Sequence, residues 1–207
     1  MAEKLPQEMA SDSWAGEMGE KWNTYVEEFE GMIAPVGSAA IRHAEFVPGE
    51  KVIDIGCGGG ATTFEIAPLV IDEEGKGHVT GLDLSQTLVN TASKRLAESG
   101  LSNVDFLCAD AAIGSLDTTY DVLFSRFGVM FFEDPVAAFR NIHRALAASG
   151  TLAFCCWQSR AVNPFMTVPA QAALELLPPP PEMPPQAPGP FAFAEPDYVH
   201  SILSQSG

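Results

Sequence analysis

The chain has few basic residues. Its 207 residues include 27 Asp and Glu but only 11 Lys and Arg, so the formal net charge is −16, and no Lys or Arg follows Arg160. Binding to nucleic acid and attraction to an anionic membrane surface both depend on clustered basic side chains. The composition therefore argues against nucleic acid as a partner, and we interpret the acidity as that of a solvated surface.

Long apolar runs and cysteine patterns are also lacking. No stretch approaches the ~20 apolar residues that a membrane-spanning helix needs, and the first residues, MAEKLPQEMASDSW, contain no apolar core of the signal-peptide kind. The four cysteines, at positions 57, 108, 155 and 156, have neither zinc-ligand spacing nor the pattern of a disulfide framework. We therefore expect no membrane insertion and a reducing, cytoplasmic environment.

The sequence does contain alternating strand and helix patterns. Short runs rich in Val, Ile and Leu alternate with segments of helical periodicity, which predicts crossover units and a parallel sheet. The expected fold class is α/β: a Rossmann-like three-layer sandwich with five parallel strands. The strands are expected at residues 51–56, 78–85, 104–111, 120–127 and 151–157.

The helical segments carry start and stop signals. An apolar stripe from Trp14 to Met32 predicts an N-terminal helix that ends at Pro35, followed by a shorter helix to about Ala44. Ser85 and Gly100 are expected to cap the helix after the second strand. Asp134-Pro135 is expected to start the helix before the fifth strand, and Ser149-Gly150 to end it.

Three parts of the chain are expected. Residues 1–45 form an N-terminal helical cap, residues 46–160 a Rossmann-like core, and residues 161–207 a further segment of helices and loop. Eight of the sixteen prolines fall within residues 178–190, so this stretch is expected to be a loop or polyproline segment.

The most specific feature is the glycine-rich stretch VIDIGCGGGA, residues 52–61. Ligands of open parallel sheets bind beyond the carboxyl ends of the strands, where glycines let a ligand approach the backbone closely. Two ligand classes fit at this point. One is a dinucleotide, because Gly56, Gly58 and Ala61 satisfy G-x-G-x-x-[GA]; the other is S-adenosylmethionine, a nucleoside with an amino-acid tail.

Acidic residues end three successive predicted strands. Asp54 would repel a pyrophosphate but could hold a ligand's ammonium group, directly or through water. Asp83 is expected to point at the ligand and accept hydrogen bonds from ribose hydroxyls, and Asp110 to lie beside an adenine amino group. Each could instead be a capping or turn residue. Asp121 lies at the start of its strand, and we interpret it as structural.

The motifs as a set resemble a known family. Asp54-x-Gly56-x-Gly58-x-Gly60 resembles the first motif of class I S-adenosylmethionine-dependent methyltransferases, and YDVLFSRFGVMFFEDP resembles their fourth-strand motif. The resemblance is closest to small-molecule methyltransferases related to the ubiquinone/menaquinone-biosynthesis enzymes. It implies S-adenosylmethionine as cofactor, bound by Asp54, Gly56, Gly58, Gly60, Asp83, Leu84, Asp110, Ala111 and Ser125.

The expected reaction is in-line displacement of a methyl group by a small-molecule acceptor. The cofactor already carries an activated methyl group, so no catalytic residue and no metal site are predicted. Two alternatives stay open: a nicotinamide-dependent oxidoreductase, and a nucleoside-binding domain without turnover. An apolar or aromatic acceptor is expected beside Phe127, Met130, Phe131, Trp157, Phe165 and Met166.

The C-terminal part is expected to be incomplete. Members of the family that the chain resembles normally add an antiparallel strand pair beside the fifth strand, whereas this sequence ends at SILSQSG. The fifth strand, TLAFCCW, would then be a sheet edge without charge or proline to protect it. It would have to be covered by residues 160–207, pair with another chain, or remain prone to aggregation.

Overall fold

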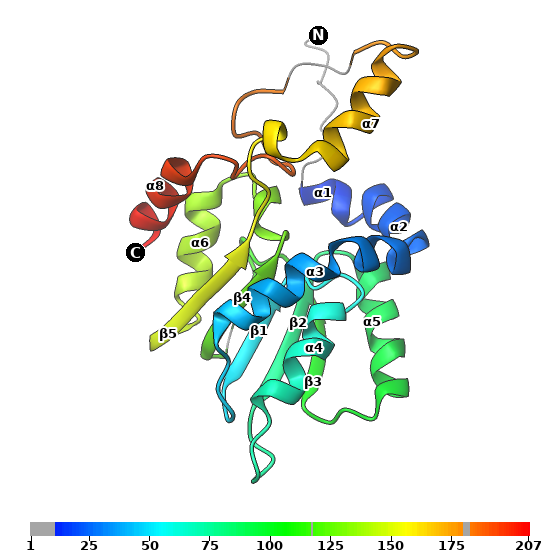
Figure 1. Cartoon of the computed structure of the whole chain (residues 1–207). Coiled ribbons are helices and arrows are strands. Elements are labelled where there is room, and N and C mark those ends of the chain that lie inside the picture. The colour runs from blue at the N-terminus through cyan, green and yellow to red at the C-terminus, as the bar shows by residue number, and fades with distance from the viewer. Residues whose placement is uncertain (1–10, 117, 180–182) are drawn as a thin grey trace.

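A single parallel sheet organises the structure. The computed structural model describes residues 11–116, 118–179 and 183–207 (Figure 1). The strand order is β3-β2-β1-β4-β5, with every neighbouring pair parallel. The strands are β1 (Lys51–Ile55), β2 (His78–Asp83), β3 (Val104–Cys108), β4 (Tyr120–Arg126) and β5 (Leu146–Cys155). The predicted five-stranded parallel sheet is therefore confirmed.

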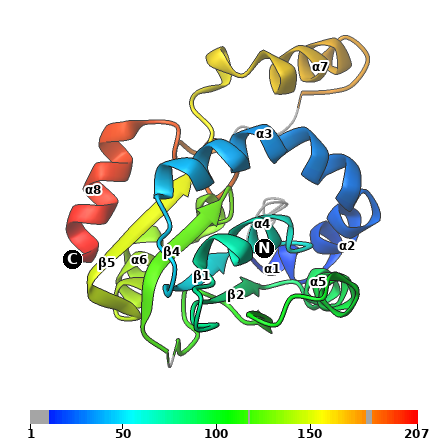
Figure 2. The same cartoon turned by 60° about the horizontal axis from the view of Figure 1, so that its bottom comes forward.

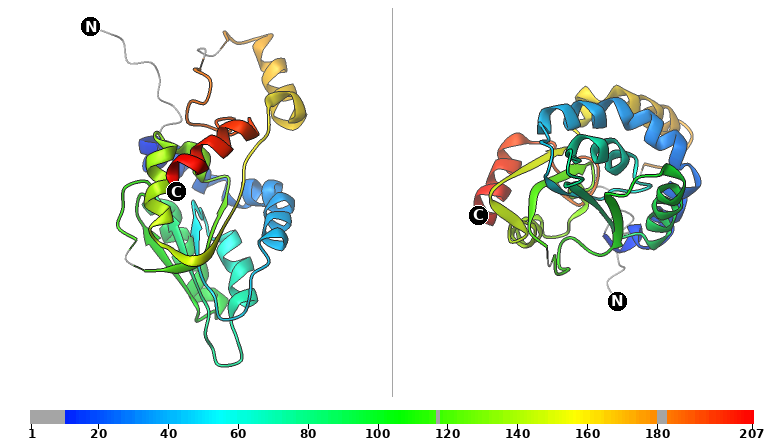
Figure 3. Two further views of the ribbon diagram at one scale, coloured as in Figure 1. Left: turned by 90° about the vertical axis from the view of Figure 1, so that its left-hand side faces the viewer. Right: turned by 90° about the horizontal axis from the view of Figure 1, so that it is seen from below.

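Helices cover both faces of the sheet and bury its apolar side chains (Figures 2 and 3). One apolar cluster lies beneath α3 (Val26–Ala44) and α4 (Ala61–Val70), and another lies against α6 (Pro135–His143) and α8 (Pro196–Ser206). Full burial of one such aliphatic or aromatic side chain contributes about 1.5–3 kcal/mol. The three-layer Rossmann-like architecture follows from this two-sided burial.

The N-terminal segment forms three helices instead of the predicted two. They are α1 (Ser11–Trp14), α2 (Glu17–Thr24) and α3. The prediction that Pro35 ends a helix is wrong, because α3 continues through it to Ala44. A proline inside a helix removes one backbone donor and bends the axis, and burial of Ile33 and Ile41 on either side of Pro35 offsets that loss. Figure 2 shows α3 as an arc over the sheet.

The cap predictions are confirmed for two helices. The Ser85 hydroxyl accepts a hydrogen bond from Leu88 N at the start of α5 (Gln86–Ser99), and Gly100 ends that helix in a left-handed conformation. Asp134 accepts from Ala137 N, with Pro135 as the first residue of α6.

The predicted end of α6 at Ser149-Gly150 is wrong. The helix stops at His143, and Ser149 and Gly150 lie inside β5. The register between β4 and β5 shifts here, since Tyr120 pairs with Leu146 but Val122 pairs with Thr151. A side chain at position 150 would collide with Leu146 and with the Asp121 carbonyl, so glycine permits this irregular pairing.

The segment after β5 extends beyond the end of the sheet at which the strands have their carboxyl ends. It contains the short helix η2 (Arg160–Val162) and α7 (Pro164–Leu174), which Figures 1 and 3 show projecting away from the layers. Another short helix, η1 (Val129–Phe131), follows β4. In the part of the chain that the structure describes, no helix has the length and apolarity needed to cross a membrane.

Candidate cofactor and acceptor site

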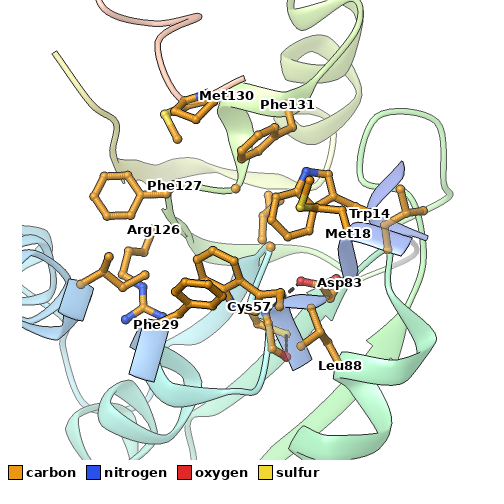
Figure 4. Close-up of a pocket in the computed structure, with 18 of the residues that line it drawn as sticks. Trp14, Met18, Phe29, Cys57, Asp83, Leu88, Arg126, Phe127, Met130 and Phe131 are labelled. Carbon is orange, nitrogen blue, oxygen red and sulfur yellow. Dashed lines mark hydrogen bonds between the residues drawn. The ribbon is translucent and has the colours of Figure 1, made fainter. Parts of the chain in front are cut away.

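A cavity of about 690 Å³ opens at the carboxyl ends of the strands (Figure 4). The loops that follow β1, β2, β3 and β4 line it, together with α2, α3 and the start of α7. Its position agrees with the rule that ligands of open parallel sheets bind where the strands end. Its size lies within the range of sites for small molecules and cofactors.

The glycine loop after β1 is held by backbone hydrogen bonds to β2. Gly56 N and Cys57 N both donate to Leu82 O, at 2.8 and 3.1 Å. Gly56 has φ +71°, and a Cβ on it would lie 2.7 Å from the Gly128 Cα, so the loops after β1 and β4 cross in contact. Gly58 has φ +57° and lines the cavity. Side chains at Gly56 or Gly58 would strain the backbone.

Asp83 connects the glycine loop to the start of α5. Its Oδ2 accepts from Gly58 N and its Oδ1 from Ser85 N, both at 2.8 Å. Burial raises the pKa of this carboxyl above its ordinary value, and the backbone N–H groups of Ser85 and Gly58 oppose that rise. A carboxylate has about four acceptor positions, so lone pairs remain for a ligand in the cavity. Asp83 lines the cavity, and it also holds two loops together.

Asp110 lies at the next strand end along the sheet. Its Oδ1 accepts from Ala112 N at 2.8 Å, which forms a tight turn after β3. Asp110, Ala111 and Leu84 all line the cavity. The structure therefore brings together Gly56, Gly58, Asp83, Leu84, Asp110 and Ala111, six of the predicted cofactor residues.

Asp54 does not line the cavity. Its side chain is fully buried between β1 and α4, where Oδ2 accepts from the hydroxyls of Thr62 at 2.6 Å and Thr63 at 2.7 Å. Its Oδ1 has no hydrogen-bond partner among the described residues. Burial raises the pKa of Asp54, while the two hydroxyls and the charge of Arg126 oppose that rise. The structure thus places Asp54 where it holds α4 against β1.

Ser125 and Gly60 also lie outside the cavity lining. The Ser125 hydroxyl donates to Ile55 O at 2.7 Å and accepts from Gly128 N at 3.2 Å, so it connects the two crossing loops. Gly60 is the N-cap of α4, and a Cβ there would lie 2.8 Å from the ring of Phe106. Ser125 therefore supports the glycine loop from outside the cavity, and Gly60 ends that loop at the start of α4.

An aromatic wall forms the side of the cavity next to β5. Phe127 is buried with φ +62°, a left-handed conformation that is uncommon for a bulky residue. Its ring stacks on Trp157 with centroids 4.0 Å apart and planes 10° apart, and Trp157 contacts Phe165. All six side chains expected near an acceptor line the cavity: Phe127, Met130, Phe131, Trp157, Phe165 and Met166.

The N-terminal apolar stripe forms the opposite wall. Its members Trp14, Met18, Trp22, Tyr25, Phe29 and Met32 all line the cavity. A cavity wall and a core face have the same helical spacing, so the sequence pattern alone does not distinguish these two roles for Trp22 and Tyr25.

The N-terminal helices are attached to the glycine loop by an ion pair. Arg95 Nη1 on α5 lies 2.8 Å from Glu30 Oε2 on α3 and also donates to Gly59 O at 2.8 Å. Sequence reasoning did not select Glu30, Arg95 or the cavity-lining Arg126. The pairing of residues 30 and 95 has no local sequence signal, whereas Arg126 stands inside the fourth-strand motif and could have been chosen. Among the described residues, no group of side chains is arranged to bind a metal.

Comparisons with known proteins identify the family. Residues 52–150 match the family described as "Methyltransferase domain". The chain is 34% identical over 152 residues to the aklanonic acid methyltransferase DauC of Streptomyces sp. (strain C5), covering 70% of this chain and 67% of that protein. It is 26% identical over 141 residues to the ubiquinone/menaquinone biosynthesis C-methyltransferase UbiE of Coxiella burnetii (strain Dugway 5J108-111), covering 67% of this chain and 55% of that one.

A solved structure agrees in fold. The S-adenosylmethionine-dependent methyltransferase from Aquifex aeolicus superposes with a TM-score of 0.60 at 22% identity, covering 83% of this chain and 78% of that one. The chain belongs to the S-adenosylmethionine-dependent methyltransferases. Some curated methyltransferases that it matches are much longer, and it spans only 19–24% of their length. None of these findings favours a nicotinamide-dependent oxidoreductase.

Asp83→Ala should weaken both the fold and cofactor binding. The substitution leaves Gly58 N and Ser85 N without their acceptor, so the Tm without ligand should fall. Loss of hydrogen bonds from a charged acceptor should also reduce S-adenosylhomocysteine affinity by about 1.5–3 kcal/mol, measured by calorimetry. Asp121→Ala is the matched control: it removes the carboxylate that accepts from Lys51 N at the other end of the sheet, and it should leave this affinity unchanged. Unchanged affinity in Asp83→Ala would contradict the ribose assignment.

Asp54→Asn should change how stability depends on pH. Because burial raises the pKa of Asp54 in the folded chain, the folded state retains a proton that the unfolded state releases above about pH 4. The stability due to that proton is present below the unfolded pKa and is lost as the pH rises through the folded pKa. Asparagine cannot ionise, so the wild-type Tm should fall relative to the variant's as the pH rises from about 4, the unfolded pKa, through the raised pKa of the folded chain. A Tm difference that stays constant over this range would contradict the expectation.

Proposed function

We propose that this chain transfers a methyl group from S-adenosylmethionine to a small apolar or aromatic acceptor. The observation that carries the proposal is the order of groups along one edge of the sheet. Asp110 follows β3, Asp83 ends β2, the glycine loop follows β1, and the Phe127–Trp157 stack follows β4 and β5. All of them face one cavity. A nucleoside site and an apolar acceptor site side by side are what methyl transfer requires.

The cavity residues fit this cofactor. The remaining lone pairs of Asp83 suit ribose hydroxyls, and the Asp110 carboxylate suits an adenine amino group between the apolar contacts of Leu84 and Ala111. The bare backbone of Gly56 and Gly58 leaves room for close approach. When bound, the cofactor supplies a methyl group that its sulfonium has already activated. For Asp54, Gly60 and Ser125 we propose an indirect role, in which they hold the glycine loop in place.

The hydrogen bonding of the loop disfavours a dinucleotide. A pyrophosphate site depends on free backbone N–H groups at the start of the following helix. Here the N–H groups of Gly56, Cys57, Gly58 and Gly60 already donate within the protein. The buried carboxylates of Asp54 and Asp83 behind the loop would also repel a pyrophosphate.

The wall next to β5 can orient an acceptor and exclude water from it. The six side chains of the wall next to β5 carry no ionisable group, so the acceptor would need to supply its own nucleophile without a base from this wall. Their aromatic faces suit a flat, apolar molecule. The names of the two curated relatives, an aklanonic acid methyltransferase and a quinone-biosynthesis methyltransferase, support an acceptor of small-molecule size.

The cellular location and the division into parts are also proposals. All four cysteines are unpaired, which supports the reducing, cytoplasmic environment expected from the sequence. Burial raises the pKa of the Cys155 thiol to about 11, so that thiol is not poised as a nucleophile. The division into a cap (1–45), a core (46–160) and an acceptor-side segment (161–207) places the aromatic wall between the last two parts.

The cofactor assignment predicts that S-adenosylhomocysteine binds and NAD does not. Calorimetry with both ligands should give a saturable signal for the nucleoside thioether alone. Saturable binding of NAD with no response to S-adenosylhomocysteine would overturn the proposal. A screen of flat apolar acceptors with methyl-labelled S-adenosylmethionine then tests turnover, because a domain that only binds the nucleoside would give no labelled product.

We further propose that two copies associate through the outer edge of β5. This strand ends the sheet order, and residues 151–157 contain no charge or proline to protect the edge. Sedimentation velocity at micromolar concentrations should then show a dimer that dissociates on dilution. Thr151→Lys places a charge at an exposed position of β5 and should shift the distribution toward monomer. A wild-type chain that is monomeric over this range would contradict the proposal.

A further inference from the structure

Among the residues that the structure describes, Arg126 is a cation of the cavity wall without an ionic partner. The cavity-lining cations among the described residues are Lys21 and Arg126. The Lys21 ammonium lies 2.6 Å from the Glu17 carboxylate on a side chain that is 64% exposed. Arg126, by contrast, makes no salt bridge with any residue that the structure describes, and the groups whose pKa values its charge lowers, the buried Asp54 and the thiol of Cys155, both lie off the cavity. A guanidinium in a mainly apolar cavity is therefore left for a ligand.

Arg126 also lies where the far end of an elongated cofactor would reach along the sheet. It is the last residue of β4, the strand beyond β1 in the order β3-β2-β1-β4. Neighbouring strands lie about 4.8 Å apart, so the step from the end of β3 to the end of β4 is about 14 Å. An elongated ligand whose adenine lies at Asp110 and whose ribose lies at Asp83 therefore extends past the glycine loop toward Arg126.

The helix above Arg126 makes room for its side chain. A Cβ on Gly37 of α3 would lie 2.9 Å from the Arg126 Cδ and 3.2 Å from its Nη1. The side chain therefore passes closely beneath α3, and Figure 4 shows it between Phe127 and Phe29. Close packing beneath α3 limits the rotamers of the arginine.

We infer that Arg126 binds the α-carboxylate of the cofactor's amino-acid tail, an inference that rests on the proposed function. That carboxylate is the anionic group of S-adenosylmethionine, and a guanidinium can bind a carboxylate through two parallel hydrogen bonds. Pairing inside a cavity of low polarity compensates both charges for their lost hydration. Arg126 is in this assignment a binding residue that orients the tail toward β4, with the nucleoside toward β2 and β3.

The test compares two ligands that differ in the tail. S-adenosylhomocysteine carries the α-carboxylate, whereas 5′-methylthioadenosine has the same nucleoside thioether without the amino-acid tail. Calorimetry on the whole chain gives the ratio of the two dissociation constants. Wild type should prefer S-adenosylhomocysteine, and Arg126→Gln should reduce that preference by about tenfold or more, the scale of a lost hydrogen bond to a charged group. Arg126→Lys keeps the charge without the planar fork and should give an intermediate ratio.

The ratio of the two dissociation constants also distinguishes loss of the carboxylate contact from damage to the fold. Loss of Arg126 removes a charge that favours ionised Asp54, so the glycine loop could be perturbed, but that perturbation affects both ligands alike. Arg140→Gln is the matched control, because Arg140 lies on α6 outside the cavity lining, where it donates to Gln205 O, and it should keep the wild-type ratio. An unchanged ratio in Arg126→Gln, a lost ratio in Arg140→Gln, or no preference in wild type would each overturn the inference while leaving nucleoside binding intact. Failure of wild type to bind either ligand would instead overturn the proposed function.

Discussion

Three consecutive backbone N–H groups fix the site, because those of Gly56, Cys57 and Gly58 all donate to the end of β2. The first two share Leu82 O and the third reaches Asp83 Oδ2. The loop after β1 therefore turns toward β2 and presents bare glycine backbone to the cavity. The second Asp83 oxygen then fixes the start of α5 through Ser85 N. Without this set of bonds, neither the cavity floor nor the position of the Asp83 carboxylate would be defined.

The same constraint determines the electrostatics of the site. Because the N–H groups of Gly56, Cys57, Gly58 and Gly60 donate within the protein, they are not available to a phosphate, and the buried carboxylates beside the loop disfavour one further. The cavity instead has acidic groups beside β2 and β3, the guanidinium of Arg126 beside β4, and an uncharged aromatic wall beside β5. This charge order matches a nucleoside with a zwitterionic tail, followed by an apolar acceptor. The pyrophosphate of a dinucleotide would instead place its negative charges beside the buried carboxylates.

The features predictable from sequence were those with local signals. Strand positions, the caps at Ser85 and Asp134, and the glycine loop each follow from a few adjacent residues, and the structure agrees with them. The errors have tertiary causes. Helix α3 passes through Pro35 because burial of its flanking residues outweighs one lost hydrogen bond, and Gly150 lies inside β5 because the shifted register needs a residue without a side chain there. Asp54 has the spacing of a cofactor ligand, but only the orientation of its side chain, toward Thr62 and Thr63, shows that it is not on the cavity.

Helix α3 shows why the cap and the core are mechanically connected. Its N-terminal half contributes Phe29 to the cavity wall and Glu30 to the ion pair with Arg95, which itself holds Gly59 O. Its C-terminal half buries Ile41 in the apolar cluster between the helix and the sheet and leaves space for Arg126 at Gly37. The proposed boundary between cap and core near residue 45 thus comes after a helix whose second half already packs in the core. Any movement of α3 would displace the cavity wall, the glycine loop and the arginine together, so access to the cavity and the geometry of its floor are set by one element.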